Sequence, residues 1–154
     1  MKKTSVFSII KTLHLAMLAG QVIFTAVIFY LIYSKMKLPI LVEHEKLLQV
    51  VALVFVTVTI FAGNSLFKKK LLVLNEDVQT ATKDKMLAYR TICLIQWALL
   101  EAGVLLCGIF ALLTANYAFL AVSVIIIIYF ALLTPVKDKI AAQLNLNSTE
   151  LDAL

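Results

Sequence analysis

The chain contains four long, almost uninterrupted apolar runs, and these restrict it to folds that use lipid as their solvent. They extend over residues 13–33, 47–67, 92–114 and 117–134. A transmembrane helix needs roughly 20 mainly apolar residues. At 62% hydrophobic residues, the chain has more apolar surface than a soluble domain of this size can bury. We therefore predict an all-α membrane protein in which residues 1–154 form one domain, an antiparallel four-helix transmembrane bundle with helical cytoplasmic extensions.

The segments between the runs predict a hairpin, a tight turn and a short terminal helix. Residues 68–91 contain neither Gly nor Pro, so the second and third runs should continue as helices and turn within residues 75–82. Residues 115–116 leave room only for a tight antiparallel connection. In the tail, residues 135–154, Val136, Ile140 and Leu144 follow Pro135 at helical spacing. This pattern predicts an amphipathic helix on the cytoplasmic membrane surface.

Basic residues are concentrated on one side of the predicted membrane. Eleven of the fourteen Lys and Arg residues belong to the N-terminus, the hairpin 68–91 and the tail. The positive-inside rule therefore predicts that both termini are cytoplasmic. The net charge of +5 follows from this topology and from contact with anionic lipid, so we expect no nucleic-acid partner. The basic residues at the membrane exit are interpreted as a topology anchor in preference to a dedicated lipid head-group site: Lys68, Lys69, Lys70 and Arg90.

Glu101 is the one acidic residue within the four runs. A carboxylate at bilayer depth is costly, which makes it by default a functional candidate. Counting from the centres of the runs places Gln21 at the same depth, so we expect a neutral Glu101 carboxyl that donates a hydrogen bond to Gln21 or to a backbone carbonyl. Such a pair either fixes the register of the helices, or Glu101 exchanges a proton or holds a cation during transport.

A second polar layer is predicted between Glu101 and the cytoplasm. Asn64 and Gln96 each lie about 10 Å from the centre of their span. Tyr129 lies between the two layers, and His14 lies slightly below both. Gln96 is roughly 140° from Glu101 around the helix. We therefore expect Gln96 to contact a different helix.

The sequence has no pattern typical of a catalytic or metal site. Cys93 and Cys107 lie on one helix, about 21 Å apart along its axis, so they are expected to be unpaired packing residues. No Cys, His and Asp spacing fits a metal site, and neither a Gly-rich phosphate loop nor a nucleophile elbow is present. We expect no enzyme activity, no metal and no cofactor.

Two likenesses to known families involve these residues. The segment ALLEA (98–102), with Gly108 downstream, resembles the carboxylate helix of the proton-translocating rotor subunit of ATP synthases. That likeness is confined to the segment, because the rotors pack through glycine-rich helices and this chain has four dispersed glycines.

The broader resemblance is to an uncharacterised family of four-span proteins common in Bacteroidetes. It extends over nearly the whole chain, through AGQ (19–21), KDKMLAYRT (83–91), WALLE (97–101) and PVKDKI (135–140). Where that pattern often has an Arg one turn before the acid, this chain has Gln96 and Trp97 nearby. The resemblance implies a multi-pass protein of the bacterial inner (cytoplasmic) membrane and assigns no activity.

Two functional hypotheses follow. The first is a small structural or accessory subunit that associates through its spans with itself, as a homo-oligomer, or with a larger membrane complex. The alternative is a proton- or cation-coupled transporter or channel with Glu101 as the titrating group. A Glu101 that faces another subunit or a water-filled cavity favours transport, whereas one capped by Gln21 favours a structural role.

Overall fold

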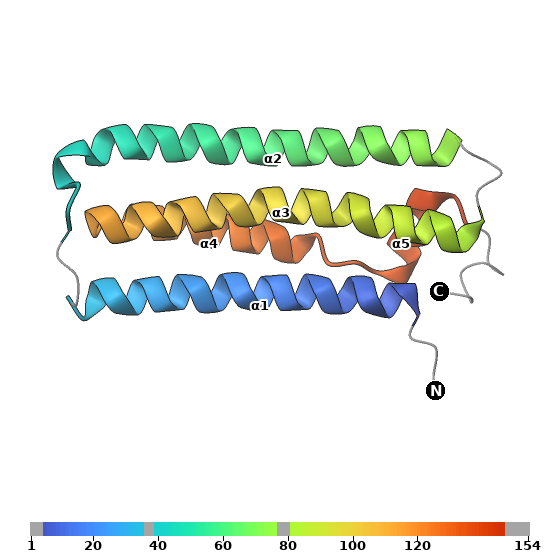
Figure 1. Ribbon diagram of the computed structural model, residues 1–154, viewed down its shortest axis with the longest axis horizontal. Helices are drawn as coiled ribbons and strands as arrows, with labels where there is room; N and C mark the ends of the chain where they lie inside the picture. The colour runs from blue at the N-terminus through green and yellow to red at the C-terminus, as the bar shows by residue number, and fades with distance from the viewer. Residues whose placement is uncertain (1–4, 36–38, 77–80, 147–154) are drawn as a thin grey trace.

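The regular structure of the described residues is entirely helical. The computed structural model describes residues 5–35, 39–76 and 81–146. Three long helices and a shorter fourth lie alongside one another, and a short one packs at their end (Figure 1). In chain order the elements are α1 (Val6–Tyr33), η1 (Val42–His44), α2 (Glu45–Glu76), α3 (Thr82–Thr114), α4 (Tyr117–Leu132) and α5 (Lys137–Leu144). The predicted all-α class is confirmed, while residues 147–154 of the predicted tail lie outside the described part of the chain.

Three helices of the described chain are long and apolar enough to cross a membrane, namely α1, α2 together with η1, and α3. A fourth span is obtained only when α4 and α5 are taken as one pair, bent by 75°. Alone, α4 has 16 residues, about 24 Å at 1.5 Å per residue, which is shorter than a hydrocarbon core of about 30 Å. The fourth apolar run is therefore a short helix followed by a break.

Pro135 explains this break. A proline has no backbone N–H and disfavours the helical conformation for the residue before it. The N–H groups of Leu133 and Thr134 instead bond to Phe130 and Ala131 carbonyls three residues earlier, and the Thr134 hydroxyl donates to the Ala131 carbonyl at 2.6 Å. The last turn of α4 is thus tightened, and the chain leaves it at an angle.

The predicted short helix after Pro135 is present as α5, but two of the apolar residues expected to face the membrane are buried in the protein. Ile140 and Leu144 are fully buried in the protein core, while Val136 precedes the helix and is 50% exposed. The bend at Pro135 turns α5 toward α2, with which it is in contact. Its apolar residues therefore pack against protein and not against lipid.

Helix α2 ends at Glu76 and α3 begins at Thr82, while residues 77–80 of the predicted turn lie outside the described residues. The predicted tight connection at residues 115–116 is confirmed. Between α3 and α4, Ala115 adopts a left-handed conformation with φ of 54°. Asn116 then caps α4, because its Oδ1 accepts a hydrogen bond from the Ala118 N–H at 2.7 Å.

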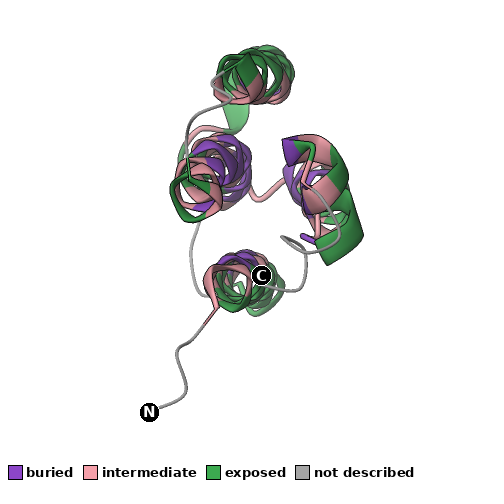
Figure 2. Cartoon of the chain, turned by 90° about the vertical axis from the view of Figure 1, so that its right-hand side faces the viewer, coloured by how far each residue is buried: buried purple, intermediate pink, exposed green. Residues whose placement is uncertain are grey.

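Helix α3 is the centre of the molecule. It packs against α1, α2 and α4, and α1 and α2 lie on opposite sides of it (Figure 2). Half of its most apolar segment is buried, compared with 22% for α2 and 11% for α1. The outer helices therefore present most of their apolar side chains to the surroundings, as expected of helices in lipid.

The buried stripe of α2, where this helix packs against α3, consists of small and medium-sized side chains. Its buried residues are Ala52, Val56, Thr59 and Gly63. Small residues allow two backbones to approach closely, and a Cβ placed on Gly63 would lie 3.6 Å from Gln96 Cγ. Beyond this stripe, most of α2 is not covered by protein.

Candidate functional site

Three polar side chains from three helices meet inside the apolar part of the molecule: Asn64 of α2, Gln96 of α3 and Tyr129 of α4. Gln96 Nε2 donates a hydrogen bond to Asn64 Oδ1 at 2.7 Å. The Asn64 amide and the Tyr129 hydroxyl are joined by contacts of 2.8 and 3.0 Å. We call this group the polar triad. Gln96 thus contacts a helix other than its own, as predicted. Tyr129, predicted between the two layers, bonds directly to Asn64. Polar groups in hydrocarbon need such partners.

A cavity of about 180 Å³ adjoins the polar triad on the side of α5. Its polar lining comprises Asn64, Gln96, Tyr89, Lys139 and Gln143. The cavity has space for a few water molecules or a small polar molecule, since one water occupies about 30 Å³. The lining offers hydrogen-bond donors and acceptors, one ammonium group and the Cys93 thiol, a set that can bind a small polar molecule.

Helix α5 closes this cavity through Gln143. The Tyr89 hydroxyl donates to Gln143 Oε1 at 2.6 Å, and Asn75 Nδ2 donates to the Gln143 carbonyl at 2.8 Å. One residue of α5 thus joins the ends of α2 and α3. Sequence reasoning missed Tyr89, Asn75 and Gln143, because nothing in the pattern showed that α5 folds back onto the hairpin.

A further polar contact lies at the opposite end of α2. Asn116, in the turn before α4, donates through Nδ2 to Glu45 Oε1, and Gln49 Nε2 donates to the same oxygen at 3.2 Å. Helix α2 is therefore held by hydrogen bonds near both ends and at the polar triad.

His14 lies outside the polar triad. It is fully buried, with its ring stacked on Phe130 at 4.6 Å and edge-on to Trp97 at 4.9 Å between centroids. His14 Nε2 lies 3.1 Å from the Phe130 carbonyl oxygen. Because a carbonyl can only accept, Nε2 carries the hydrogen. His14 therefore adds a second hydrogen bond to the Phe130 carbonyl, which also accepts from the Leu133 N–H at the end of α4.

Glu101 and Gln21 do not form the predicted hydrogen bond. Gln21 is 2% exposed, and neither atom of its amide group has a hydrogen-bond partner in the described part of the chain. Contacts of His14 with Trp97 and of Phe24 with Gly108 align α1 with α3. By this alignment Glu101 is level with residue 18, and Gln21 lies about one helical turn further along.

Glu101 lies at the edge of the contact between α1 and α3. The residue is partly exposed. Around the circumference of α3, the buried Trp97 and Gly108 lie on one side of it, and Leu105, which is 41% exposed, lies on the other side. Among the described residues, its carboxyl forms neither a hydrogen bond nor an ion pair. It is thus a partly exposed, unpaired acid within a helix that is long and apolar enough to cross a membrane.

The remaining predicted site residues lie near the membrane exit. Lys68, Lys69 and Lys70 are exposed, whereas Arg90 is partly buried and its Nε has no hydrogen-bond partner within the described residues. Cys93 and Cys107 are unpaired and buried. In the same part of the chain, no group of three or more His, Cys, Asp or Glu side chains is arranged to hold a metal ion.

No protein-family model matches this chain, and neither the curated proteins nor the solved structures contain a match. The resemblance to the Bacteroidetes family therefore stays a prediction. Function has to be argued from the site itself.

Proposed function

We propose that the protein is a small structural or accessory subunit that associates through its spans with a second copy of itself or with a larger membrane complex. The observation that carries this proposal is the position of Glu101. Its carboxyl lies at bilayer depth, partly exposed, without a hydrogen-bond partner among the described residues. An unpaired polar group in hydrocarbon is costly, and a donor from a neighbouring polypeptide would remove that cost.

The other polar groups support the same interpretation. The polar triad is hydrogen-bonded internally, as expected of groups that fix how helices pack. In the proposed arrangement the four helical segments form an antiparallel bundle in a bacterial inner membrane, and both termini are cytoplasmic. The extensive apolar outer faces of α1 and α2 then contact lipid or a partner's helices.

A proton- or cation-coupled transporter or channel is the second candidate. It is favoured because Gln21 does not form the predicted hydrogen bond to Glu101 and the acid is partly exposed. In an oligomer, Glu101 would then face a neighbouring protomer, where transfer of a proton or cation is possible.

Two substitutions at Glu101 distinguish these functions. For an accessory subunit, Glu101→Gln should retain assembly, since an amide also forms hydrogen bonds, whereas Glu101→Leu should weaken association about 3- to 30-fold, equivalent to about 0.6 to 2 kcal/mol. The measurement is the mass of the purified assembly in mild detergent over a dilution series. Glu76→Leu, the same change at an exposed acid outside the apolar runs, serves as the control and should leave the mass unchanged.

The two candidates give opposite results in proteoliposomes. A coupled transporter should lose ion-driven flux in Glu101→Gln, which cannot ionise, while its expression and assembly stay normal. If Glu101→Leu left the mass of the assembly unchanged, the proposed accessory role would be wrong. Flux in the parent protein that disappears in Glu101→Gln would establish the alternative.

Cysteine labelling tests the proposed orientation. Pro39 lies in the connection before α2 and Glu76 ends α2, and both positions are exposed. In intact cells, Pro39→Cys should react with a membrane-impermeant thiol reagent, and Glu76→Cys should react only after permeabilisation. The parent chain, with Cys93 and Cys107 buried, is the control. Labelling in the reverse order would show that the termini lie outside.

A further inference from the structure

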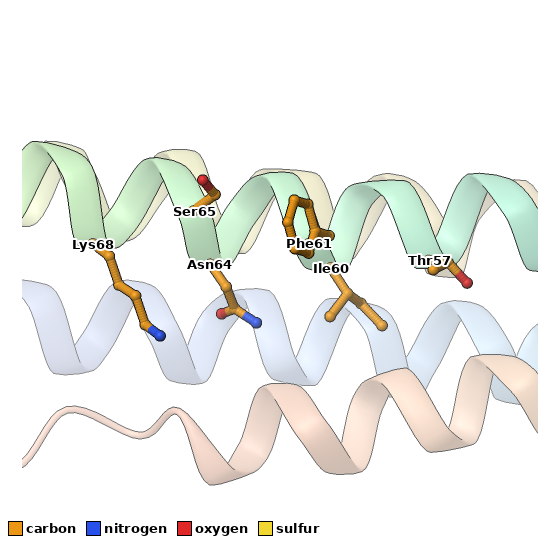
Figure 3. Close-up of a pocket in the computed structure, with 6 residues that line it drawn as sticks. All are labelled: Thr57, Ile60, Phe61, Asn64, Ser65 and Lys68. Carbon is orange, nitrogen blue, oxygen red and sulfur yellow. The ribbon is translucent and has the colours of Figure 1, made fainter.

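One flank of α2 borders a groove of about 630 Å³. The residues that line it are Thr57, Ile60, Phe61, Asn64, Ser65 and Lys68. Within the described chain, α2 packs mainly against α3, so this flank is not covered by another helix. Figure 3 shows Ile60, Asn64 and Lys68 projecting in a row from one side of α2, with the Lys68 side chain extending toward Asn64.

The chemistry of the lining changes in one direction along the groove. Ile60 and Phe61 make its deeper part apolar, Asn64 and Ser65 add an amide and a hydroxyl, and Lys68 places an ammonium group at its end. From Thr57 to Lys68 the groove follows α2 for about 16 Å. A glycerophospholipid has the same order of groups, namely acyl chain, ester-linked glycerol and phosphate.

The depth of each residue agrees with this order. Thr57 is at the centre of the second apolar run, so Asn64 lies about 10 Å and Lys68 about 16 Å from the bilayer centre. Half of a typical hydrocarbon core is about 15 Å. Lys68 is therefore at the edge of the hydrocarbon core, next to the head-group region, whereas Ile60 and Phe61 are at acyl-chain depth.

We infer that this groove binds one anionic glycerophospholipid from the leaflet on the side of the α2–α3 hairpin. Its acyl chain lies along Ile60 and Phe61, and its phosphate accepts a charge-assisted hydrogen bond from Lys68. The groove lining contains no acidic side chain that would repel a negative head group. The groove does not include Glu101, so the inference stands independently of the proposed function.

Native mass spectrometry of the purified full chain tests this inference with two probes, dioleoyl-phosphatidylglycerol and dioleoyl-phosphatidylcholine. We expect one phosphatidylglycerol molecule to be retained in preference to phosphatidylcholine. Lys68→Gln should weaken phosphatidylglycerol binding about ten-fold, as expected for the loss of one hydrogen bond to a charged group. The matched control is Lys70→Gln, which removes the same charge outside the groove lining and should change binding by less than about two-fold.

Three results would overturn the inference. Equal losses in Lys68→Gln and Lys70→Gln would show diffuse attraction to the lysine cluster, and equal retention of the two lipids by the parent would show no selection of an anionic head group. Efficient disulfide cross-linking of Phe61→Cys between two chains in lipid would show that a helix of a second copy fills the groove. Circular dichroism melting of each variant checks that these exposed substitutions leave the helices intact.

Discussion

Trp97→Ala is expected to destabilise the protein by about 3 to 5 kcal/mol, the range for removal of a large buried aromatic side chain. Trp97 is 1% exposed and lies among α1, α3 and α4. Its ring contacts His14 edge-on at 4.9 Å and Phe130 at 6.1 Å between centroids. In a bilayer, van der Waals packing and not water exclusion holds helices together, so the cavity left by the indole would remove contacts from three helices at once.

Unfolding in a mixed-micelle denaturant titration measures this effect. Tyr117→Ala is the control, because Tyr117 is an aromatic residue that is 46% exposed and its truncation should change stability by no more than about 0.5 kcal/mol. Loss of the Trp97 contacts should also weaken the hydrogen bond from His14 to the Phe130 carbonyl. If both variants unfolded at the same denaturant concentration as the parent, the packing described around Trp97 would be incorrect.

Gly108→Ala is expected to cost about 1 to 3 kcal/mol, because it overfills the contact between α3 and α1. A Cβ at this position would lie 2.9 Å from Phe24 Cζ and closer still to Cε1, so the Phe24 ring would have to move. Gly20 provides a matched control on α1, since a Cβ there meets no atom within 4 Å. Gly20→Ala should be neutral or stabilising by up to about 1 kcal/mol, as expected for replacement of an unconstrained helical glycine.

A second substitution tests the cause of the Gly108 effect. Phe24→Leu should restore much of the stability of Gly108→Ala, because a smaller side chain leaves room for the new methyl group. The measurement is a double-mutant cycle, in which the two substitutions should be strongly non-additive. Equal changes in the free energy of unfolding for Gly20→Ala and Gly108→Ala would contradict the close approach of α1 and α3 at Gly108.

The helices were predictable from sequence because their lengths and ends depend on local features. Four apolar runs, a hairpin without Gly or Pro and a two-residue turn located α1 to α4 with few errors. The packing of α5 was not predictable, because Ile140 and Leu144 suit a membrane surface and a protein core equally well. The spacing of apolar residues reports which face is buried, and not what buries it.

The two polar layers show why one site prediction succeeded and the other did not. For Gln96, depth and direction around the helix together predict a contact with a different helix. The hydrogen bond to Asn64 is that contact. The pairing of Glu101 with Gln21 was based on depth alone. Counting from span centres assumes that no helix is shifted along its axis, whereas α1 is shifted along α3 by about one turn relative to that count. In addition, the depth of Gln21 does not show in which direction around α1 its side chain points.

The attachments of α2 determine how this helix can move. Its hydrogen bonds to Asn116 near one end, to the polar triad in the middle and to Gln143 near the other end are distributed over almost its whole length. A slip of α2 by one turn, about 5.4 Å, would break all of them together, while a smaller slip would distort them without offering new partners. Helix α2 therefore has a single register, and it leaves that register only by releasing every attachment at once.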